Sequence, residues 1–260
     1  MRWLIFVSVV GISMSVGLRA QTGAAASTAP APAASLSREE VQKMEVEDAR
    51  MKAQLQDWAQ LGKYQAANGA LTSPVKVVFF GDSITEAWEY NGGSFFPGKP
   101  YLNRGISGQT TPQMLVRFEQ DVVHLHPAVV VILAGTNDVA GNTGPETPAM
   151  IEDNFRAMTD IARRNGIRVV LASITPAARY PWRPGVESVP EIRELNAWLK
   201  QYAAEQKLIY LDYYSAMADA DGAMKPGLSS DGVHPTEAGY AVMAPLAEAA
   251  IAQALKRERP

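Results

Sequence analysis

The stretch Val75-Lys76-Val77-Val78-Phe79-Phe80-Gly81-Asp82-Ser83-Ile84-Thr85-Glu86 decides how the rest of the chain is interpreted. Its first half is an apolar, β-branched and aromatic run with the length of a buried strand. The run stops at Gly81-Asp82-Ser83, where glycine permits a tight backbone turn. A serine just beyond the carboxyl end of a strand lies where open α/β sheets place their chemistry. A serine after a strand more often only caps the following helix, so this stretch alone leaves both interpretations open.

The composition of the 260-residue chain suits one α/β domain with additional segments, because 47% hydrophobic residues can fill a sizeable core. The formal net charge of −3 argues against a nucleic-acid partner, which usually requires a basic surface. The chain has no cysteine, which excludes a thiol nucleophile, a disulfide framework and a lipid-anchored N-terminal cysteine.

The N-terminus has the pattern of a secretory signal over residues 1–20, with Arg2 followed by an apolar run from Trp3 to Val16. The run is shorter than the roughly 20 residues of a membrane span. We therefore expect a periplasmic or secreted protein with no stable membrane anchor after signal removal; an uncleaved N-terminal anchor is the alternative. Residues 21–37 are rich in Ala and Pro and are expected to form a flexible linker.

Residues 38–68 have the pattern of one amphipathic helix, with Ser37 and Glu40 as its capping box. Five apolar residues fall on one face of this helix: Val41, Met44, Met51, Leu55 and Trp58. The sequence predicts that this stripe packs on the following domain or forms an oligomer with a second chain.

From Val75 onward, strand-like and helix-like segments alternate as far as Lys256. The expected strands are residues 75–80, 100–104, 128–133, 168–174 and 208–213. One helix is expected to begin at Thr111, and three more are expected over residues 148–165, 191–206 and 236–256. This order predicts an α/β domain over residues 75–256, with a parallel sheet between two layers of helices.

Parallel strands direct their carboxyl ends to one edge of the sheet, so the turns that follow them meet there. Short polar residues and glycines recur in these turns: Gly81-Asp82-Ser83, Ser107-Gly108 and Gly135-Thr136-Asn137-Asp138. The loop from Asp231 to His234 can reach the same edge.

A serine nucleophile needs a base within hydrogen-bond reach, and that base needs an acceptor to orient it. Of the three histidines, His124 and His126 lie at the end of a predicted helix, where the helix dipole favours them, and their spacing argues against a paired metal site. His234 remains as the candidate base, with Asp231 three residues earlier as its orienting group. An Asp-x-x-His sequence is also common in loops that only stabilise themselves.

An oxyanion needs preorganised donors, and two residues of these turns are candidates. Gly108 can present its backbone N–H where a side chain would obstruct, and Asn137 can present its side-chain amide. Each also has a purely structural interpretation, as a turn glycine and as an asparagine bonded to its own backbone.

Four segments together resemble the conserved blocks of the SGNH, or GDSL, esterase and lipase family. They are Phe79-Phe80-Gly81-Asp82-Ser83-Ile84-Thr85, Gly105-Ile106-Ser107-Gly108, Gly135-Thr136-Asn137-Asp138 and Asp231-Gly232-Val233-His234-Pro235. The resemblance implies Ser83 as nucleophile, His234 as base and Asp231 as its orienting group. It also implies oxyanion donors from the backbone of Ser83 and Gly108 and from the Asn137 side chain, on a three-layer, flavodoxin-like sheet of five parallel strands.

The Asp-Ser-Ile-Thr form of the first block resembles the branch that contains platelet-activating-factor acetylhydrolases and carbohydrate acetylesterases. Thr85 stands where the Gly-x-Ser-x-Gly elbow of ordinary α/β-hydrolases needs a glycine, so that elbow is disfavoured. The resemblance implies an acyl-enzyme mechanism with no metal and no organic cofactor.

Two loops are expected to wall the active site, residues 88–100 and residues 175–190, the second carrying Tyr180, Trp182 and Arg183. Neither has the long apolar run of an acyl tunnel, so we expect short-chain esters, chiefly acetyl esters, of a small-molecule, carbohydrate or lipid alcohol. A lysophospholipase, a lipase or a thioesterase of the same family is the alternative. A non-catalytic carbohydrate-binding module is disfavoured because every catalytic position is filled.

Overall fold

The computed structural model describes residues 36–260, of which residues 46–260 form one compact unit that contains the sheet. The predicted signal peptide and most of the predicted linker lie outside the described residues. The helices are α1 (Arg38–Gln56), α2 (Gly62–Gly69), α3 (Ser83–Glu86), α4 (Trp88–Asn91), α5 (Thr111–Asp121), η1 (Val123–Leu125), α6 (Thr136–Val139), α7 (Pro148–Arg164), α8 (Ser188–Glu205), α9 (Tyr213–Met217) and α10 (Glu237–Lys256).

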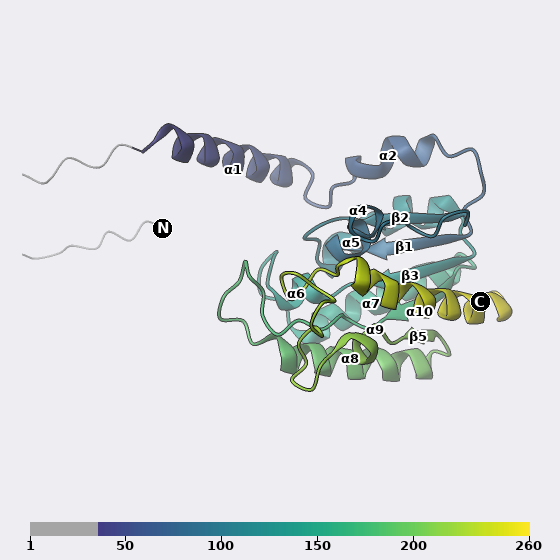
Figure 1. The fold of residues 1–260 in the computed structure, drawn as a ribbon. Helices are drawn as coiled ribbons and strands as arrows, with labels where there is room; N and C mark the ends of the chain where they lie inside the picture. Colours follow the sequence, from purple (N-terminus) through teal and green to yellow (C-terminus); the bar gives the residue numbers. More distant parts are fainter. Residues whose placement is uncertain (1–35) are drawn as a thin grey trace, which may run out of the picture. The chain divides into compact units, whose positions relative to one another are not determined.

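A five-stranded parallel sheet in the order β2-β1-β3-β4-β5 forms the centre of the fold (Figure 1). The strands are β1 (Val77–Gly81), β2 (Tyr101–Gly105), β3 (Val129–Leu133), β4 (Arg168–Ala172) and β5 (Ile209–Leu211). All residues of β1 and β3 are buried, as expected for central strands covered on both faces. The predicted α/β fold with five parallel strands is therefore confirmed.

Helices cover both faces of the sheet, so that alternate strand residues enter two separate cores. One core holds Val78, Phe80, Val130 and Ile132 with apolar residues of α5, α7 and α8. The other core holds Val77, Phe79, Val129 and Val131 with apolar residues of α9 and α10. Helix α10 is long and apolar enough to cross a membrane, but Met243, Ala247 and Ile251 bury its apolar face in the second core.

The prediction of a single helix over residues 38–68 is wrong, because the structure has two helices there, α1 and α2, with a turn between them. The Asp57 carboxylate accepts hydrogen bonds from the N–H groups of Leu61 and Gly62, at 2.8 and 2.9 Å. These bonds satisfy N–H groups that have no partner within α2, and so stabilise the start of a separate helix. Gln60 in this turn has a left-handed backbone, with φ of +54°. The predicted apolar stripe continues to Trp58, but all five of its side chains are exposed.

Helix α2 is fastened to the edge of the sheet and to α5. The Tyr64 hydroxyl donates to the carbonyl of Gly105 at 2.5 Å. Asn68 donates to the Asp121 carboxylate at 2.8 Å and accepts from the Arg104 guanidinium at 2.8 Å. Because β2 is an edge strand, α2 covers a part of the sheet that would otherwise be open to another chain.

Two glycines paired in register let the first turn after β1 lie directly against β2. A Cβ on Gly81 would lie 2.1 Å from the Thr85 hydroxyl, and a Cβ on Gly105 would lie 2.2 Å from the Glu86 nitrogen. Neither position has room for a side chain, so glycine here sets the close approach of α3 to the sheet.

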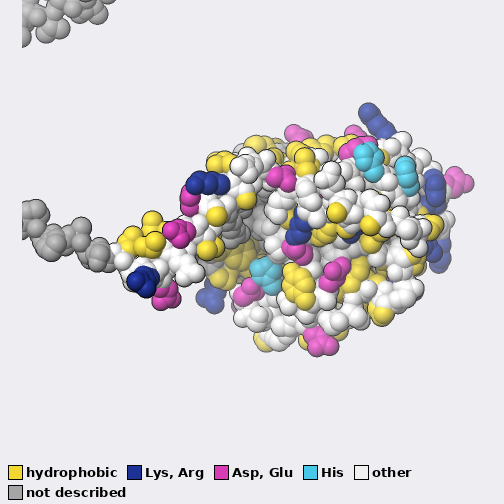
Figure 2. Space-filling model, turned by 90° about the horizontal axis from the view of Figure 1, so that it is seen from above, with side chains coloured by type: hydrophobic (Ala, Val, Ile, Leu, Met, Phe, Trp, Pro, Cys, Tyr) yellow, Lys and Arg dark blue, Asp and Glu magenta, His cyan; other side chains and the backbone are white. Residues whose placement is uncertain are grey.

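Figure 2 shows that acidic and basic side chains are interspersed on the face seen from above.

Candidate active site

The predicted site residues come from four separate segments at the carboxyl edge of the sheet (Figure 1). Ser83 is the first residue of α3, directly after β1, and Gly108 lies in the turn after β2. Asn137 is in α6 after β3, and Asp231 and His234 lie in the loop before α10. The structure brings all five residues together at this edge.

Ser83, His234 and Asp231 form one continuous chain of hydrogen bonds. The Ser83 Oγ lies 2.9 Å from Nε2 of His234, and Nδ1 of the same ring lies 2.6 Å from Oδ2 of Asp231. Because an ionised carboxylate only accepts, Nδ1 carries a proton and Nε2 of the neutral ring is the acceptor for the serine hydroxyl. This arrangement can remove a proton from Ser83 as it attacks a carbonyl carbon.

The Asp231 carboxylate is held in the ionised form by its own loop. Partial burial acts to raise its pKa, but bonds from the His234 ring and from the backbone N–H groups of His234 and Val233 outweigh this effect. The net result is a pKa of about 2. Oδ1 also accepts from the Ser229 hydroxyl at 3.1 Å, so the loop fixes the orientation of the carboxylate as well as its charge.

The backbone N–H groups of Ser83 and Gly108 are two candidate donors at the site. Ser83 opens α3, so its N–H has no partner within that helix. Gly108 is exposed and has φ of +78°, a conformation that L-residues rarely adopt. Among the described residues, the N–H of Gly108 has no backbone acceptor.

Asn137 is held with one amide hydrogen engaged and the other available. Its Nδ2 donates to the carbonyl of Gln109 at 3.0 Å, and its Oδ1 accepts from Nδ2 of Asn142 at 2.8 Å. The side chain is buried, with only 2% of the residue exposed. A primary amide has two donor hydrogens, so one remains for a ligand.

Ser83 and His234 open into a cavity of about 440 Å³, here called the Ser83 cavity. Its lining residues are Ser83, Ser107, Gly108, Asn137, Asn142, Trp182, Arg183 and His234. Trp182 lies 5.8 Å from the His234 ring between centroids, and its indole N–H donates to Asn142 at 3.0 Å. Trp182 and Arg183 belong to one of the two loops that the sequence predicted to wall the site. Tyr180, from the same loop, is instead buried and bonded to Thr136.

The prediction that residues 88–100 also wall the active site is wrong, because none of these residues lines the Ser83 cavity. Its aromatic residues Trp88, Phe95 and Phe96 pack around Phe79 with ring centroids 4.9 to 5.7 Å apart. Burial of these large rings stabilises the core more than exposure at the rim would. Asn142, by contrast, lines the cavity without having been predicted, because a lone asparagine in a turn carries no sequence signal.

The remaining histidines lie apart from the site. His124 and His126 are exposed at and just after η1, beyond the end of α5, and neither lines the Ser83 cavity. Asp82, next to the serine, is fully buried and caps α3 through the N–H of Ile84 at 2.9 Å. Burial raises the pKa of Asp82 to about 6, although the bond from Ile84 and the nearby His234 act to lower it.

Comparison with known proteins places the chain in a family. The sequence profile of the GDSL-like lipase/acylhydrolase family matches residues 79–242, and the chain belongs to this family. The protein is therefore an enzyme that hydrolyses ester bonds.

Individual relatives agree with this assignment. The chain is 28% identical over 201 residues to an acetylxylan esterase of Geobacillus stearothermophilus, over 65% of this chain and 90% of that protein. It is 29% identical over 137 residues to the esterase TesA of Pseudomonas aeruginosa, over 52% of this chain and 60% of TesA. The crystal structure of a GDSL-like lipase from Bacteroides thetaiotaomicron is 42% identical, with a TM-score of 0.74 over 76% of this chain and 100% of that one.

Proposed function

We propose that this protein is a periplasmic or secreted serine esterase that removes short acyl groups, chiefly acetyl, from carbohydrate hydroxyls. The observation that carries the proposal is the hydrogen-bonded chain from Ser83 through His234 to Asp231. Beside it lies the Gly108 N–H, which has no backbone acceptor in the part of the chain that the structure describes. The similarity to an acetylxylan esterase supports the acyl and alcohol classes. The signal-like pattern of residues 1–20 supports the location.

The proposed reaction begins with attack of Ser83 Oγ on the ester carbonyl while Nε2 of His234 takes the hydroxyl proton. Asp231 keeps the ring in the required tautomer and stabilises the imidazolium that forms. The N–H groups of Ser83 and Gly108 and the free amide hydrogen of Asn137 stabilise the oxyanion. His234 then protonates the leaving alcohol, and the acyl group remains on Ser83.

Deacylation uses the same groups in a second round. A water molecule attacks the acyl carbonyl while Nε2 of His234 accepts its proton, and the same oxyanion donors hold the second tetrahedral intermediate. Collapse of the intermediate returns the proton from His234 to Ser83 and releases the carboxylic acid. The attacking water supplies the hydroxyl of the acid and the proton that returns to Ser83, so the cycle leaves the enzyme unchanged.

A second candidate, an esterase or thioesterase for longer acyl chains, is favoured by one feature. A cavity of about 270 Å³ shares Asn142 with the Ser83 cavity and is lined on one side by the apolar Met51, Leu55 and Trp58, with Gln113 and Thr143 completing its lining. An acyl chain that extends past Asn142 would meet these apolar side chains. The polar lining of the Ser83 cavity itself favours the short-chain assignment.

Hydrolysis of p-nitrophenyl acetate, butyrate and octanoate by the wild type and by Ser83→Ala tests the proposal. We expect the highest kcat/KM on acetate and a loss of at least about 10³-fold in kcat for Ser83→Ala. Reaction with a fluorophosphonate should add one adduct per chain, on Ser83. The highest rate on octanoate would move the assignment to long-chain esters, and equal rates for mutant and wild type would remove Ser83 as the nucleophile.

A further inference from the structure

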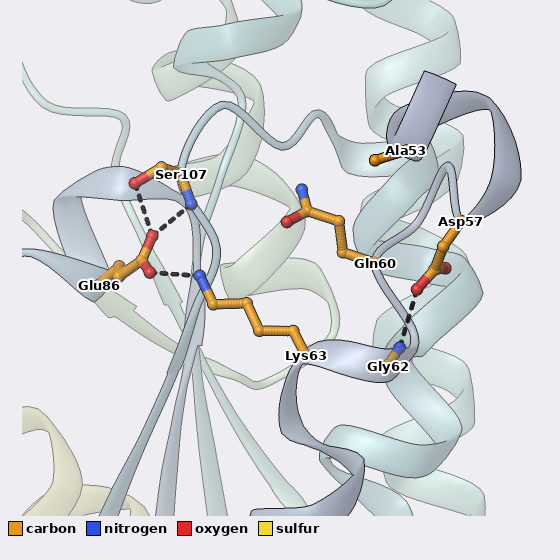
Figure 3. Close-up of a pocket in the computed structure, with 7 residues that line it drawn as sticks. All are labelled: Ala53, Asp57, Gln60, Gly62, Lys63, Glu86 and Ser107. Carbon is orange, nitrogen blue, oxygen red and sulfur yellow. Dashed lines mark hydrogen bonds and ion pairs between the residues drawn. The ribbon is translucent and has the colours of Figure 1, made fainter. Parts of the chain in front are cut away.

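A second cavity of about 520 Å³ lies next to the Ser83 cavity and is here called the Gln60 cavity (Figure 3). Its lining residues are Ala53, Asp57, Gln60, Gly62, Lys63, Glu86 and Ser107. Ser107 lines both cavities, so the two spaces meet beside Gly108. The volume is within the range of about 300–1,000 Å³ of small-molecule sites. Three of the lining residues, Ala53, Asp57 and Gln60, come from α1 and the turn that precedes α2.

One wall of the Gln60 cavity is a hydrogen-bonded group of three side chains. The Glu86 carboxylate pairs with the Lys63 ammonium and accepts from the N–H and hydroxyl of Ser107 at 2.6 and 2.5 Å. Glu86 lies three residues after Ser83, on the same short helix α3. The wall therefore begins one helical turn from the proposed nucleophile.

The opposite wall directs one amide side chain into the space. Asp57 holds the turn through the N–H groups of Leu61 and Gly62, and Gln60 in this turn has φ of +54°. A non-glycine residue in this conformation is strained, and such strain is concentrated at functional sites. In Figure 3 the Gln60 amide lies between the Glu86–Ser107 group and the Asp57 turn, and no hydrogen bond joins it to the other residues drawn. The amide offers both a donor and an acceptor.

The charges in the Gln60 cavity select against an anionic occupant. The lining contains two carboxylates, Asp57 and Glu86, and one ammonium, Lys63, so a phosphate head group would meet an excess of negative charge. Hydroxyl groups, which donate and accept in equal measure, suit a lining of carboxylate, ammonium and amide. A neutral polyol is therefore the occupant that the lining favours.

We propose that the Gln60 cavity binds the alcohol part of the substrate, a neutral sugar unit that extends past Ser107 while its acyl ester lies at Ser83. This inference rests on the proposed esterase function and assigns the alcohol specificity to a segment that precedes the catalytic sheet. Gln60 is the central contact, through hydrogen bonds from its amide to sugar hydroxyls.

The test compares xylose tetraacetate with p-nitrophenyl acetate, which has the same acyl group and no polyol. Two variants remove the amide in different ways: Gln60→Gly relieves the left-handed backbone, and Gln60→Met keeps a side chain of similar length. We expect both to lower the ratio of kcat/KM on the sugar ester to that on p-nitrophenyl acetate about tenfold, the effect of one lost hydrogen bond. Free xylotriose should inhibit p-nitrophenyl acetate hydrolysis by the wild type competitively, and less by both variants.

The matched control is Lys207→Gly, because Lys207 has a similar φ of +55° and precedes β5 at the opposite edge of the sheet. This control should keep the wild-type ratio. An unchanged ratio in both Gln60 variants, or faster cleavage of lysophosphatidylcholine than of xylose tetraacetate, would overturn the sugar site. Neither result would affect the esterase proposal, which fails separately if Ser83→Ala keeps its activity.

Discussion

The Glu86 carboxylate accepts from both the backbone N–H and the hydroxyl of Ser107, at 2.6 and 2.5 Å. Its other oxygen pairs with the ammonium of Lys63 on α2. Partial burial acts to raise the pKa of Glu86, but the bonds from Lys63 and Ser107 outweigh it, and the net pKa is lowered. Because Ser107 precedes Gly108, an ionised Glu86 ties the proposed oxyanion donor to α3 and to α2.

This tie predicts that Glu86→Ala lowers kcat on p-nitrophenyl acetate about 10- to 100-fold, because a small displacement of the Gly108 N–H weakens oxyanion stabilisation. Glu86→Gln keeps an acceptor for Ser107 and should recover most of the lost rate. The control is Glu89→Ala, an exposed carboxylate three residues further on, which should leave kcat unchanged. A rise in KM at constant kcat would show that Glu86 acts on binding alone.

Asn137→Ala should lower kcat about 30- to 10³-fold, equivalent to roughly 2–4 kcal/mol of activation free energy, through loss of one oxyanion donor. KM should change little, because the donor acts mainly on the charge that develops during the reaction. Steady-state kinetics on p-nitrophenyl acetate, with a urea midpoint to confirm folding, measure both effects. Wild-type turnover in a folded Asn137→Ala protein would exclude the amide from the oxyanion site.

The pH dependence of kcat/KM should have an acid limb with a slope of one. Asp231, with a pKa of about 2, stays ionised throughout the range from pH 4 to pH 9, so of the three hydrogen-bonded residues only the proposed base loses function on the acid side. A slope of two, or a rate that stays flat down to pH 4, would contradict these roles. In stability terms, the Asp231 contribution is present above its unfolded pKa of 3.8 and is lost as the pH falls through about 2.

Asp82→Asn should stabilise the protein more at pH 8 than at pH 5. The folded pKa of Asp82, about 6, lies above its unfolded value of 3.8, so its contribution is full below pH 3.8 and is lost as the pH rises through 6. Asparagine is neutral at both pH values and keeps the acceptor for Ile84. We expect the gain in unfolding free energy to be larger at pH 8 by about 1–3 kcal/mol. Urea unfolding at the two pH values measures it, and an equal effect at both would show that burial does not penalise the charge.

The sequence alone determined the fold class, because the central strands are continuous apolar runs that only a sheet covered on both faces can bury. It also predicted Asp231 as the partner of His234, because residues three apart in one loop can form that contact locally. The contact of His234 with Ser83 crosses 151 residues, and it was predicted only because several separate segments together resembled a family.

The tertiary structure decided what surrounds these residues. The helical spacing of apolar residues continues past Asp57, so the sequence carries no sign of the break between α1 and α2. The break depends on hydrogen bonds from the Leu61 and Gly62 N–H groups to the Asp57 carboxylate, which leave the apolar pattern unchanged. The aromatic residues around Phe79 entered the core, and Asn142 reached the site, through contacts between distant segments. The Gln60 cavity likewise exists only where the turn before α2 meets the segment after β2. Local hydrogen bonds and apolar periodicity can be read along a chain, whereas a cavity depends on how packed elements meet in space.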